Sequence, residues 1–219
     1  MRFHDFVRAA QGWATHLREV VFSNPFVEIH RVKMTSPTRH EGFEWTVCHR
    51  KPGVCVAAQT SDGDFVMIRQ ERVPIQDSLW EFPAGQIDHV GLHDWEAICE
   101  TGLRELLEEA GFEPAGGAEI VSLHHFLTSA GFTDEHCYLI WVRGVCASSQ
   151  GAHHDAGEAI TDVRVFSPDE LRAMVASGEV RDANTLSCLA RLAAIGVWAA
   201  GAPNTQKTSP PVNGTEGDV

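Results

Sequence analysis

Three glutamates crowd onto one face of a predicted helix, and this feature constrains the chain more than any other. The segment 104–111 reads RELLEEAG and places Glu105, Glu108 and Glu109 at i, i+3 and i+4. Such positions are neighbours on a helix surface, and each like-charge pair there costs about 0.2–0.5 kcal/mol. The opposite side carries the apolar residues that we expect to be buried, namely Cys99, Leu103, Leu106 and Ala110. The cluster is therefore unfavourable unless cations bind over it, and the competing interpretation is a solvated acidic face.

Strands and helices are expected in an irregular order around this helix. Strands are indicated by alternating patterns or by short apolar runs that end in turns. The expected strands are 26–34, 44–50, 53–60, 64–72, 79–85, 118–127, 136–145 and 160–166. The expected helices are 1–21, 95–110, one that opens with the capping box of Ser167, Pro168 and Glu170, and 182–201. This order favours an α+β fold, an α-β-α sandwich around a mixed sheet, over an alternating parallel sheet.

Composition divides the chain into three parts. Residues 1–50 form a helix-and-strand extension, and 51–200 form the main domain. Residues 202–219 are rich in Pro, Thr, Asn and Gly and contain no aromatic residue, so we expect a disordered tail. Gly111 is expected to end the central helix as a C-cap residue, because glycine tolerates positive φ.

Charge and cysteine content exclude several classes of function. Acidic residues outnumber basic ones 30 to 17, and the net charge of −13 argues against a nucleic-acid surface. The six cysteines form no C-x-x-C pair, and the N-terminus lacks the apolar run of a signal peptide. No run of about 18 apolar residues is present. We therefore expect a cytoplasmic protein with reduced thiols that binds neither nucleic acid nor membrane.

The residues around the glutamate cluster resemble the Nudix box, Gly-x5-Glu-x7-Arg-Glu-U-x-Glu-Glu-x-Gly-U with U apolar. The matching residues are Gly85, Glu96, Arg104, Glu105, Glu108, Glu109 and Gly111. The spacing from Glu96 through Phe112 has no gap. Ten residues separate Gly85 from Glu96 where the family pattern has five, so we expect 89–95 to form a longer loop. The resemblance implies the Nudix-type α-β-α sandwich with a mixed sheet.

The same resemblance implies a divalent-metal site on the acidic helix. Glu105 and Glu109 would be the main ligands, and Glu108 would share metal ions or bound water. The main-chain carbonyl of Ala84 would be a further ligand. Arg104 would orient the carboxylates by bidentate hydrogen bonds, which lysine cannot duplicate. Mg²⁺ and Mn²⁺ both accept oxygen ligands, so the choice between them stays open.

Four flanking motifs resemble the branch of the family that cleaves ADP-ribose and other nucleoside diphosphate sugars. They are IRQERVP, LWEFPAGQID, SAGFTDE and GEVRDANTL, and the resemblance spans 24–195. It implies that Arg72 contacts the phosphates or the terminal ribose and that Glu81 lies close to the metals. It also implies that Glu135 contacts the ribose or a partner subunit.

The N-terminal strands of such enzymes commonly pair across a homodimer. They also hold the nucleobase of the substrate against an aromatic ring. Phe26 is the candidate for this ring, and Trp45 is a similar one, although an apolar residue that opens a strand usually belongs to the core.

The general base needs a separate carboxylate, because glutamates that bind two cations are poor bases. In similar enzymes the base is a glutamate just before the last core strand. This position selects Glu158, with Asp155 as the alternative, while a solvated loop acid is the competing interpretation. The histidine pairs at 124–125 and 153–154 lack the i, i+4 spacing of a zinc helix, and no G-x-x-x-x-G-K-[ST] motif is present.

The leading hypothesis is a metal-dependent hydrolase that splits ADP-ribose or a related nucleoside diphosphate sugar into a nucleoside monophosphate and a sugar phosphate. Two alternatives are a nucleoside triphosphate pyrophosphohydrolase of the same fold and a non-catalytic sensor that binds ADP-ribose. The WEFPAG strand and the N-terminal extension argue against the first, because smaller triphosphate enzymes generally lack them. The intact acids and the short tail argue against the second. The preferred sugar depends on pocket geometry and stays open.

Overall fold

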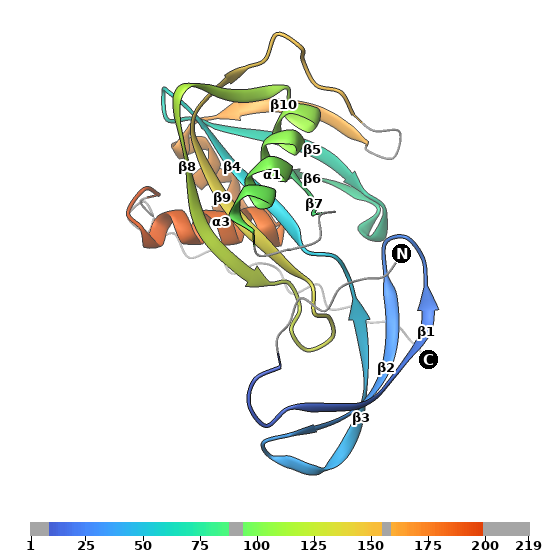
Figure 1. The fold of residues 1–219 in the computed structure, drawn as a ribbon. Coiled ribbons are helices and arrows are strands. Elements are labelled where there is room, and N and C mark those ends of the chain that lie inside the picture. Colours follow the sequence, from blue (N-terminus) through green and yellow to red (C-terminus); the bar gives the residue numbers. More distant parts are fainter. Residues whose placement is uncertain (1–8, 88–93, 155–158, 199–219) are drawn as a thin grey trace, which may run out of the picture.

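The computed structural model describes residues 9–87, 94–154 and 159–198, which form two β-sheets and three α-helices (Figure 1). The N-terminal sheet contains β1 (Ala14–Ser23), β2 (Glu28–Ser36) and β3 (Arg39–His49). The larger, seven-stranded sheet contains β4 (Gly53–Thr60), β5 (Phe65–Arg72), β6 (Asp77–Glu81), β7 (Ala84–Gln86), β8 (Phe112–Leu127), β9 (His136–Ala147) and β10 (Ile160–Phe166). The helices are α1 (Trp95–Ala110), α2 (Pro168–Ser177) and α3 (Ala183–Ala194), and a 3-10 turn, η1 (Val73–Ile75), joins β5 to β6.

The larger sheet is mixed, as predicted. Its strand order is β10-β5-β4-β9-β8, with β6 beside β5 and β7 beside β4. β4 and β9 run parallel, whereas the other neighbours are antiparallel. β4 pairs with β5 at Gln59 and Phe65 and with β7 at its opposite end. The short strand β7, which carries Ala84 and Gly85, therefore lies beside the start of β4.

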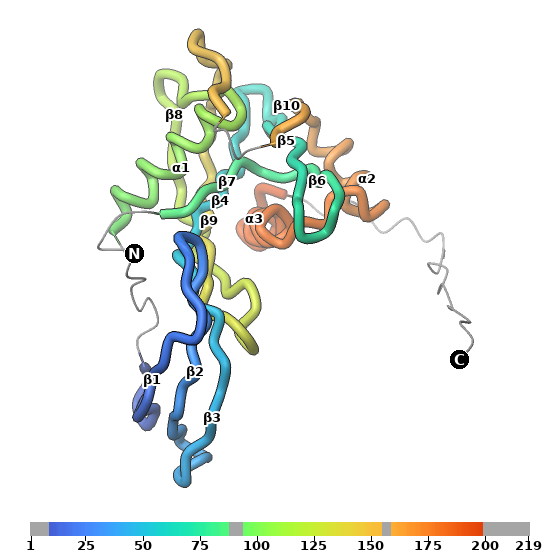
Figure 2. The backbone as a smooth tube through the Cα atoms, turned by 90° about the vertical axis from the view of Figure 1, so that its right-hand side faces the viewer, coloured from blue at the N-terminus to red at the C-terminus, as the bar shows by residue number. Residues whose placement is uncertain are grey.

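Helices cover both faces of this sheet, which confirms the predicted sandwich. Figure 1 shows α1 on one face and α3 on the other. Alternate residues of β4 point to opposite faces, so Val54 and Val56 pack on the α1 side with Leu106. Cys55 belongs to the other apolar cluster, which includes Leu192 of α3. The N-terminal sheet extends away from this body (Figure 2).

Local signals set the ends of the helices where the sequence predicts them. Asp94 caps α1 by accepting a hydrogen bond from the Glu96 N–H at 3.0 Å. Gly111 ends the helix with φ of 69°, a left-handed conformation that favours glycine. The capping box of Ser167 and Glu170 opens α2 as predicted.

The buried face of α1 differs from the predicted stripe. Leu106 is buried as expected, but Cys99 and Leu103 are only partly buried. Glu105 and Glu109 are buried instead, with 6% and 2% of their surface exposed. The reason is that α1 packs against β7 as well as against β4 and β8, so it is enclosed on more than its apolar side.

The prediction of a helix over 1–21 is wrong for the residues that the structure describes. β1 begins at Ala14 and pairs with β2 in an antiparallel ladder. Leu17, Val20 and Val21 have the i, i+3, i+4 spacing of a helix, which explains the error. An Asn24 turn brings the following strand back, with the Asn24 side chain accepting from the Phe26 N–H at 2.8 Å, so strand pairing prevails over the local pattern.

Other boundaries shift by a few residues. The predicted strand 79–85 is divided between β6 and β7, β8 begins at Phe112 rather than at 118, and α3 ends at Ala194. Most of the predicted loop 89–95 and the predicted tail 202–219 lie outside the described residues. Within the described ranges, no helix is long and apolar enough to cross a membrane.

Gly102 lets α1 approach the sheet, and replacing it should destabilise the fold. A Cβ at this position would lie 2.6 Å from Ile140 Cδ1 and 3.2 Å from Val56 Cγ2. We expect Gly102→Val to lower the free energy of unfolding by about 1–3 kcal/mol, measured by urea denaturation, because overpacking displaces the core. Gly116→Val is the control, since nothing lies within 4 Å of a Cβ there. Equal stability of the two variants would contradict this account.

Candidate active site

The acidic face of α1 is docked against β7. The backbone N–H of Ala84 donates to Glu109 Oε2 at 2.8 Å. Gly85 lies directly against Glu105, and a Cβ at Gly85 would be 2.0 Å from Glu105 Cδ. The structure therefore brings together the strand end and the two glutamates that the sequence nominates, and any side chain at position 85 would have to displace the Glu105 carboxylate.

Arg104 forms hydrogen bonds with the carboxylates of Glu105 and Glu108. Its Nη2 donates to Glu105 Oε1 and its Nη1 donates to Glu108 Oε2, both at 2.5 Å. Partial burial alone would lower the pKa of Arg104, but the charges of Glu105 and Glu108 and these hydrogen bonds raise it above its ordinary value. The contacts are one hydrogen bond to each of two carboxylates, and the orienting role that the resemblance implies for Arg104 stays a prediction.

The oxygen atoms available on this face are of the kinds that bind a hard divalent cation. Glu105, Glu109 and Glu108 offer carboxylate oxygens, and Ala84 offers a carbonyl, which are the ligand types that Mg²⁺ and Mn²⁺ take. Glu108 keeps 36% of its side chain exposed, so this face is open to solvent. Across the described residues, no three acidic, histidine or cysteine side chains form a ready-made cage. Arg104 engages two of these carboxylates in this structure.

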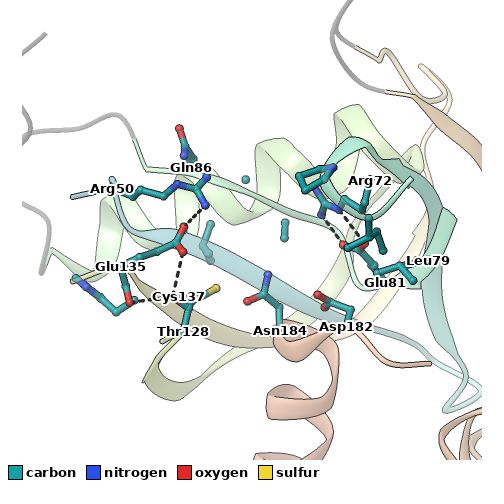
Figure 3. Close-up of a pocket in the computed structure, with 17 residues that line it drawn as sticks. Arg50, Arg72, Leu79, Glu81, Gln86, Thr128, Glu135, Cys137, Asp182 and Asn184 are labelled. Carbon is teal, nitrogen blue, oxygen red and sulfur yellow. Dashed lines mark hydrogen bonds and ion pairs between the residues drawn. The ribbon is translucent and has the colours of Figure 1, made fainter. Parts of the chain in front are cut away.

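A cleft of about 360 Å³ opens beside β7. Ala84, Gly85 and Gln86 of β7 form part of its wall. Figure 3 shows one arginine–glutamate pair at each end, Arg72 with Glu81 and Arg50 with Glu135. The start of α3 contributes further polar side chains, Asp182 and Asn184.

The Arg72–Glu81 pair is bidentate. Arg72 Nε donates to Glu81 Oε1 at 2.8 Å, and Nη2 donates to Oε2. Glu81 is 1% exposed, and burial raises its pKa above the ordinary value although Arg72 opposes the shift. The hydrogen bond from Arg72 to Glu81 in turn raises the pKa of Arg72. The two residues therefore form one unit in the wall of the cleft.

The Arg50–Glu135 pair closes the opposite end. Arg50 Nη1 lies 2.9 Å from Glu135 Oε1, and the hydroxyl of Thr128 donates to Glu135 Oε2 at 3.0 Å. Sequence reasoning found Glu135 but missed Arg50, Asp182 and Asn184. The latter two belong to the quoted motif GEVRDANTL, and Asp182 is the N-cap of α3, so a signal for them was present.

The predicted aromatic candidates lie on the N-terminal part of the chain. Phe26 is 65% exposed and does not line the cleft. Trp45 lines a separate pocket of about 440 Å³ with Phe132, and its indole Nε1 donates to the Gly131 carbonyl at 3.3 Å. The structure therefore does not bring Phe26 and Trp45 to the cleft within one chain.

The candidate bases, Glu158 and Asp155, lie outside the described residues. The described part of their loop is attached to the end of α1. His154 Nε2 lies 3.0 Å from the Glu109 carbonyl, and the His153 N–H donates to the Glu108 carbonyl at 2.8 Å. Residues 153 and 154 therefore lie at the C-terminal end of α1.

A mixed sheet between helical layers, with a glutamate-bearing helix docked on a glycine strand end, defines a Nudix-type hydrolase domain. The chain belongs to the NUDIX domain family, whose profile matches residues 49–187. Over 172 residues it is 29% identical to the ADP-ribose pyrophosphatase of Bacillus subtilis (strain 168). This alignment covers 78% of this chain and 87% of that protein.

Two further proteins extend the comparison. Over 169 residues the chain is 30% identical to the methanol dehydrogenase activator of Bacillus methanolicus. This alignment covers 77% of this chain and 85% of that protein. The crystal structure of an ADP compounds hydrolase shares the fold with a TM-score of 0.67 and 16% identity, over 87% of this chain and 100% of that one. The predicted resemblance to the Nudix family and its ADP-ribose branch is confirmed.

The contact of Gly85 with Glu105 makes a testable prediction. We expect Gly85→Ala to displace the Glu105 carboxylate and to reduce hydrolysis about 100-fold, because small displacements of catalytic groups have effects of that order. The measurement is initial-rate kinetics together with thermal melting. Gly116→Ala, which adds a methyl group in open space, should retain the parental rate. A fully active Gly85→Ala enzyme would show that the rate of hydrolysis does not depend on the position of the Glu105 carboxylate.

Proposed function

We propose that the protein hydrolyses the diphosphate of ADP-ribose or a related nucleoside diphosphate sugar to a nucleoside monophosphate and a sugar phosphate. The observation that carries the proposal is the docking of Glu105 and Glu109 onto the Ala84–Gly85 strand end beside a cleft with arginines at both ends. The similarity to an ADP-ribose pyrophosphatase supports the choice of substrate.

Mg²⁺ or Mn²⁺ would be held by Glu105, Glu109 and the Ala84 carbonyl, with Glu108 sharing metal ions or water. When bound, such a cation polarises the diphosphate and lowers the pKa of a water molecule that attacks phosphorus. Arg104 orients Glu105 and Glu108 through its two hydrogen bonds. Because Glu108 is the most exposed of the three acids, it is the one that can adjust its position on binding.

The arginines of the cleft would bind the substrate. Arg72 uses Nε and Nη2 on Glu81, and a guanidinium has five N–H donors, so others can contact a phosphate oxygen. At the other end, the carboxylate of Glu135 is an acceptor suited to ribose hydroxyls. The opposed pairs would therefore orient the diphosphate relative to the sugar.

Glu158 is the proposed general base, which accepts the proton of the attacking water, and Asp155 is the alternative. The contacts of His153 and His154 with the carbonyl oxygens of Glu108 and Glu109 support this assignment, because they hold the residues just before position 155 at the end of the helix that carries the acids. We expect Glu158→Gln to lower kcat about 100- to 10,000-fold with little change in KM, as for loss of a general base. Glu113→Gln is the control in steady-state kinetics. Parental kcat in Glu158→Gln would transfer the role to Asp155.

The activity itself is tested by product analysis with Mg²⁺, with Mn²⁺ and with chelator. The substrates are ADP-ribose, other nucleotide sugars, nucleoside triphosphates and dinucleoside polyphosphates. We expect metal-dependent release of AMP and ribose 5-phosphate from ADP-ribose. Pyrophosphate from a triphosphate would instead indicate the triphosphate enzyme, and ADP-ribose binding without turnover would indicate a sensor.

The box acids are tested by a Glu108→Gln and Glu109→Gln double variant. We expect at least about a 100-fold loss of kcat, because the cation ligands and their charge are removed. A Glu119→Gln and Glu179→Gln double variant removes the same charge elsewhere and should hydrolyse at the parental rate. Parental activity in the first variant would eliminate the proposed mechanism.

We further propose a homodimer in the cytoplasm, formed through the N-terminal strands. β1 leaves Leu17, Val20 and Phe22 about half exposed, and an exposed apolar edge strand favours pairing with another strand. A partner copy would bring Phe26 or Trp45 toward the nucleobase. All six cysteines are free, which agrees with a reducing compartment.

The proposed dimer is tested by introducing charged side chains on the exposed strand β1. We expect Val20→Lys with Phe22→Lys to halve the molar mass measured by light scattering, because two buried charges without partners oppose association. Val165→Lys, at an exposed apolar position on β10, is the control and should leave the mass unchanged. A wild-type protein with the mass of one chain would refute the proposal.

A further inference from the structure

The end of β3 and the segment before β9 are joined side by side. The Cys48 N–H donates to the Phe132 carbonyl at 3.0 Å, and Cys48 forms a parallel bridge with Thr133. The Arg50 N–H donates to Asp134 Oδ1 at 3.3 Å. The two segments therefore keep a defined register next to the cleft.

Two side-chain pairs follow one another along this junction. His49 Nδ1 is bonded to Asp134 Oδ2, and the next residue of each segment forms the Arg50–Glu135 pair at 2.9 Å. His49 is 1% exposed, whereas Arg50 and Glu135 line the cleft (Figure 3). The buried pair thus lies directly behind the pair that faces the substrate.

The buried pair is also in contact with the N-terminal sheet. The ring of His30 on β2 lies 5.3 Å from the ring of His49, and His30 Nε2 is bonded to Glu28 Oε2 at 2.9 Å. His30 Nδ1 is a buried nitrogen without a hydrogen-bond partner in the described part of the chain.

We propose that His49 and Asp134 are positioning residues that determine substrate affinity by holding the Arg50–Glu135 pair at its end of the cleft. The inference rests on the proposed function. In it, the junction between β3 and the segment before β9 recognises the sugar end of a nucleoside diphosphate sugar. If His49 releases Asp134, the Asp134 side chain keeps only the 3.3 Å hydrogen bond from the Arg50 N–H, and the neighbouring Glu135 carboxylate is held less firmly in place.

The test compares His49→Leu with His49→Asn. Leucine removes the bond to Asp134, whereas the asparagine amide nitrogen can occupy about the place of Nδ1 and donate to the same carboxylate. We expect His49→Leu to raise KM for ADP-ribose about tenfold with kcat within about twofold, and His49→Asn to stay within about threefold of the parent. Val145→Ala, a core truncation at the far end of β9, should lower the melting temperature without changing KM.

A double-mutant cycle separates positioning from stability. In an Arg50→Met and Glu135→Gln background, His49→Leu should have no further effect on KM, because the pair it positions is already gone. The same increase in both backgrounds, or an increase in KM for Val145→Ala, would overturn the inference. A loss of kcat at constant KM would also overturn it.

Hydrogen exchange of the free protein gives a readout that needs no substrate. The amides of 132–135 should exchange faster in His49→Leu than in His49→Asn or the parent. Unchanged exchange in His49→Leu would overturn the positioning role even if the protein does not hydrolyse ADP-ribose. Failure of the parent to hydrolyse ADP-ribose and every other nucleoside diphosphate sugar of the panel would refute the proposed function, and the exchange experiment would still decide the role of His49.

Discussion

The contact between α1 and β7 is the constraint on which the rest of the site depends. Glu109 accepts the Ala84 N–H at 2.8 Å, and Glu105 occupies the space that a side chain at position 85 would need. Burying carboxylates is unfavourable unless they receive hydrogen bonds or opposite charge, which Ala84 and Arg104 supply. The strand end, which forms part of the wall of the cleft, and the helix are therefore joined through the two buried carboxylates.

The cleft offers an acidic protein a way to bind the proposed diphosphate substrate. The chain has a net charge of −13, yet an arginine lies at each end of the cleft, held by Glu81 or by Glu135. Carboxylate contacts fix each guanidinium in direction while leaving other N–H donors for a ligand. Electrostatic attraction is thus local to the site, where divalent cations would add to it, and does not require a basic surface.

Much of the main domain could be predicted because its signals are local. The N-cap, the i, i+3, i+4 carboxylates and Gly111 define α1 from 95 to 110, and Ser167 with Glu170 opens α2. The prediction of an N-terminal helix was wrong because Leu17, Val20 and Val21 fit a helical spacing. The observed strand depends on pairing with β2. The buried side of α1 was misjudged because the position of β7 over Glu105 and Glu109 depends on contacts between distant segments.

By itself, the sequence determined that Glu105, Glu108 and Glu109 share one helix face with Arg104 beside them, since helical geometry makes these residues neighbours in any fold. The class of chemistry followed from the resemblance of this segment to the Nudix box. Only the tertiary structure decided which residues share the cleft. Arg50 and Glu135 are 85 positions apart, as are His49 and Asp134, and each pair meets because β3 ends alongside the segment before β9. No local pattern encodes such a meeting, because it depends on where β3 ends relative to a segment more than 80 residues later in the chain.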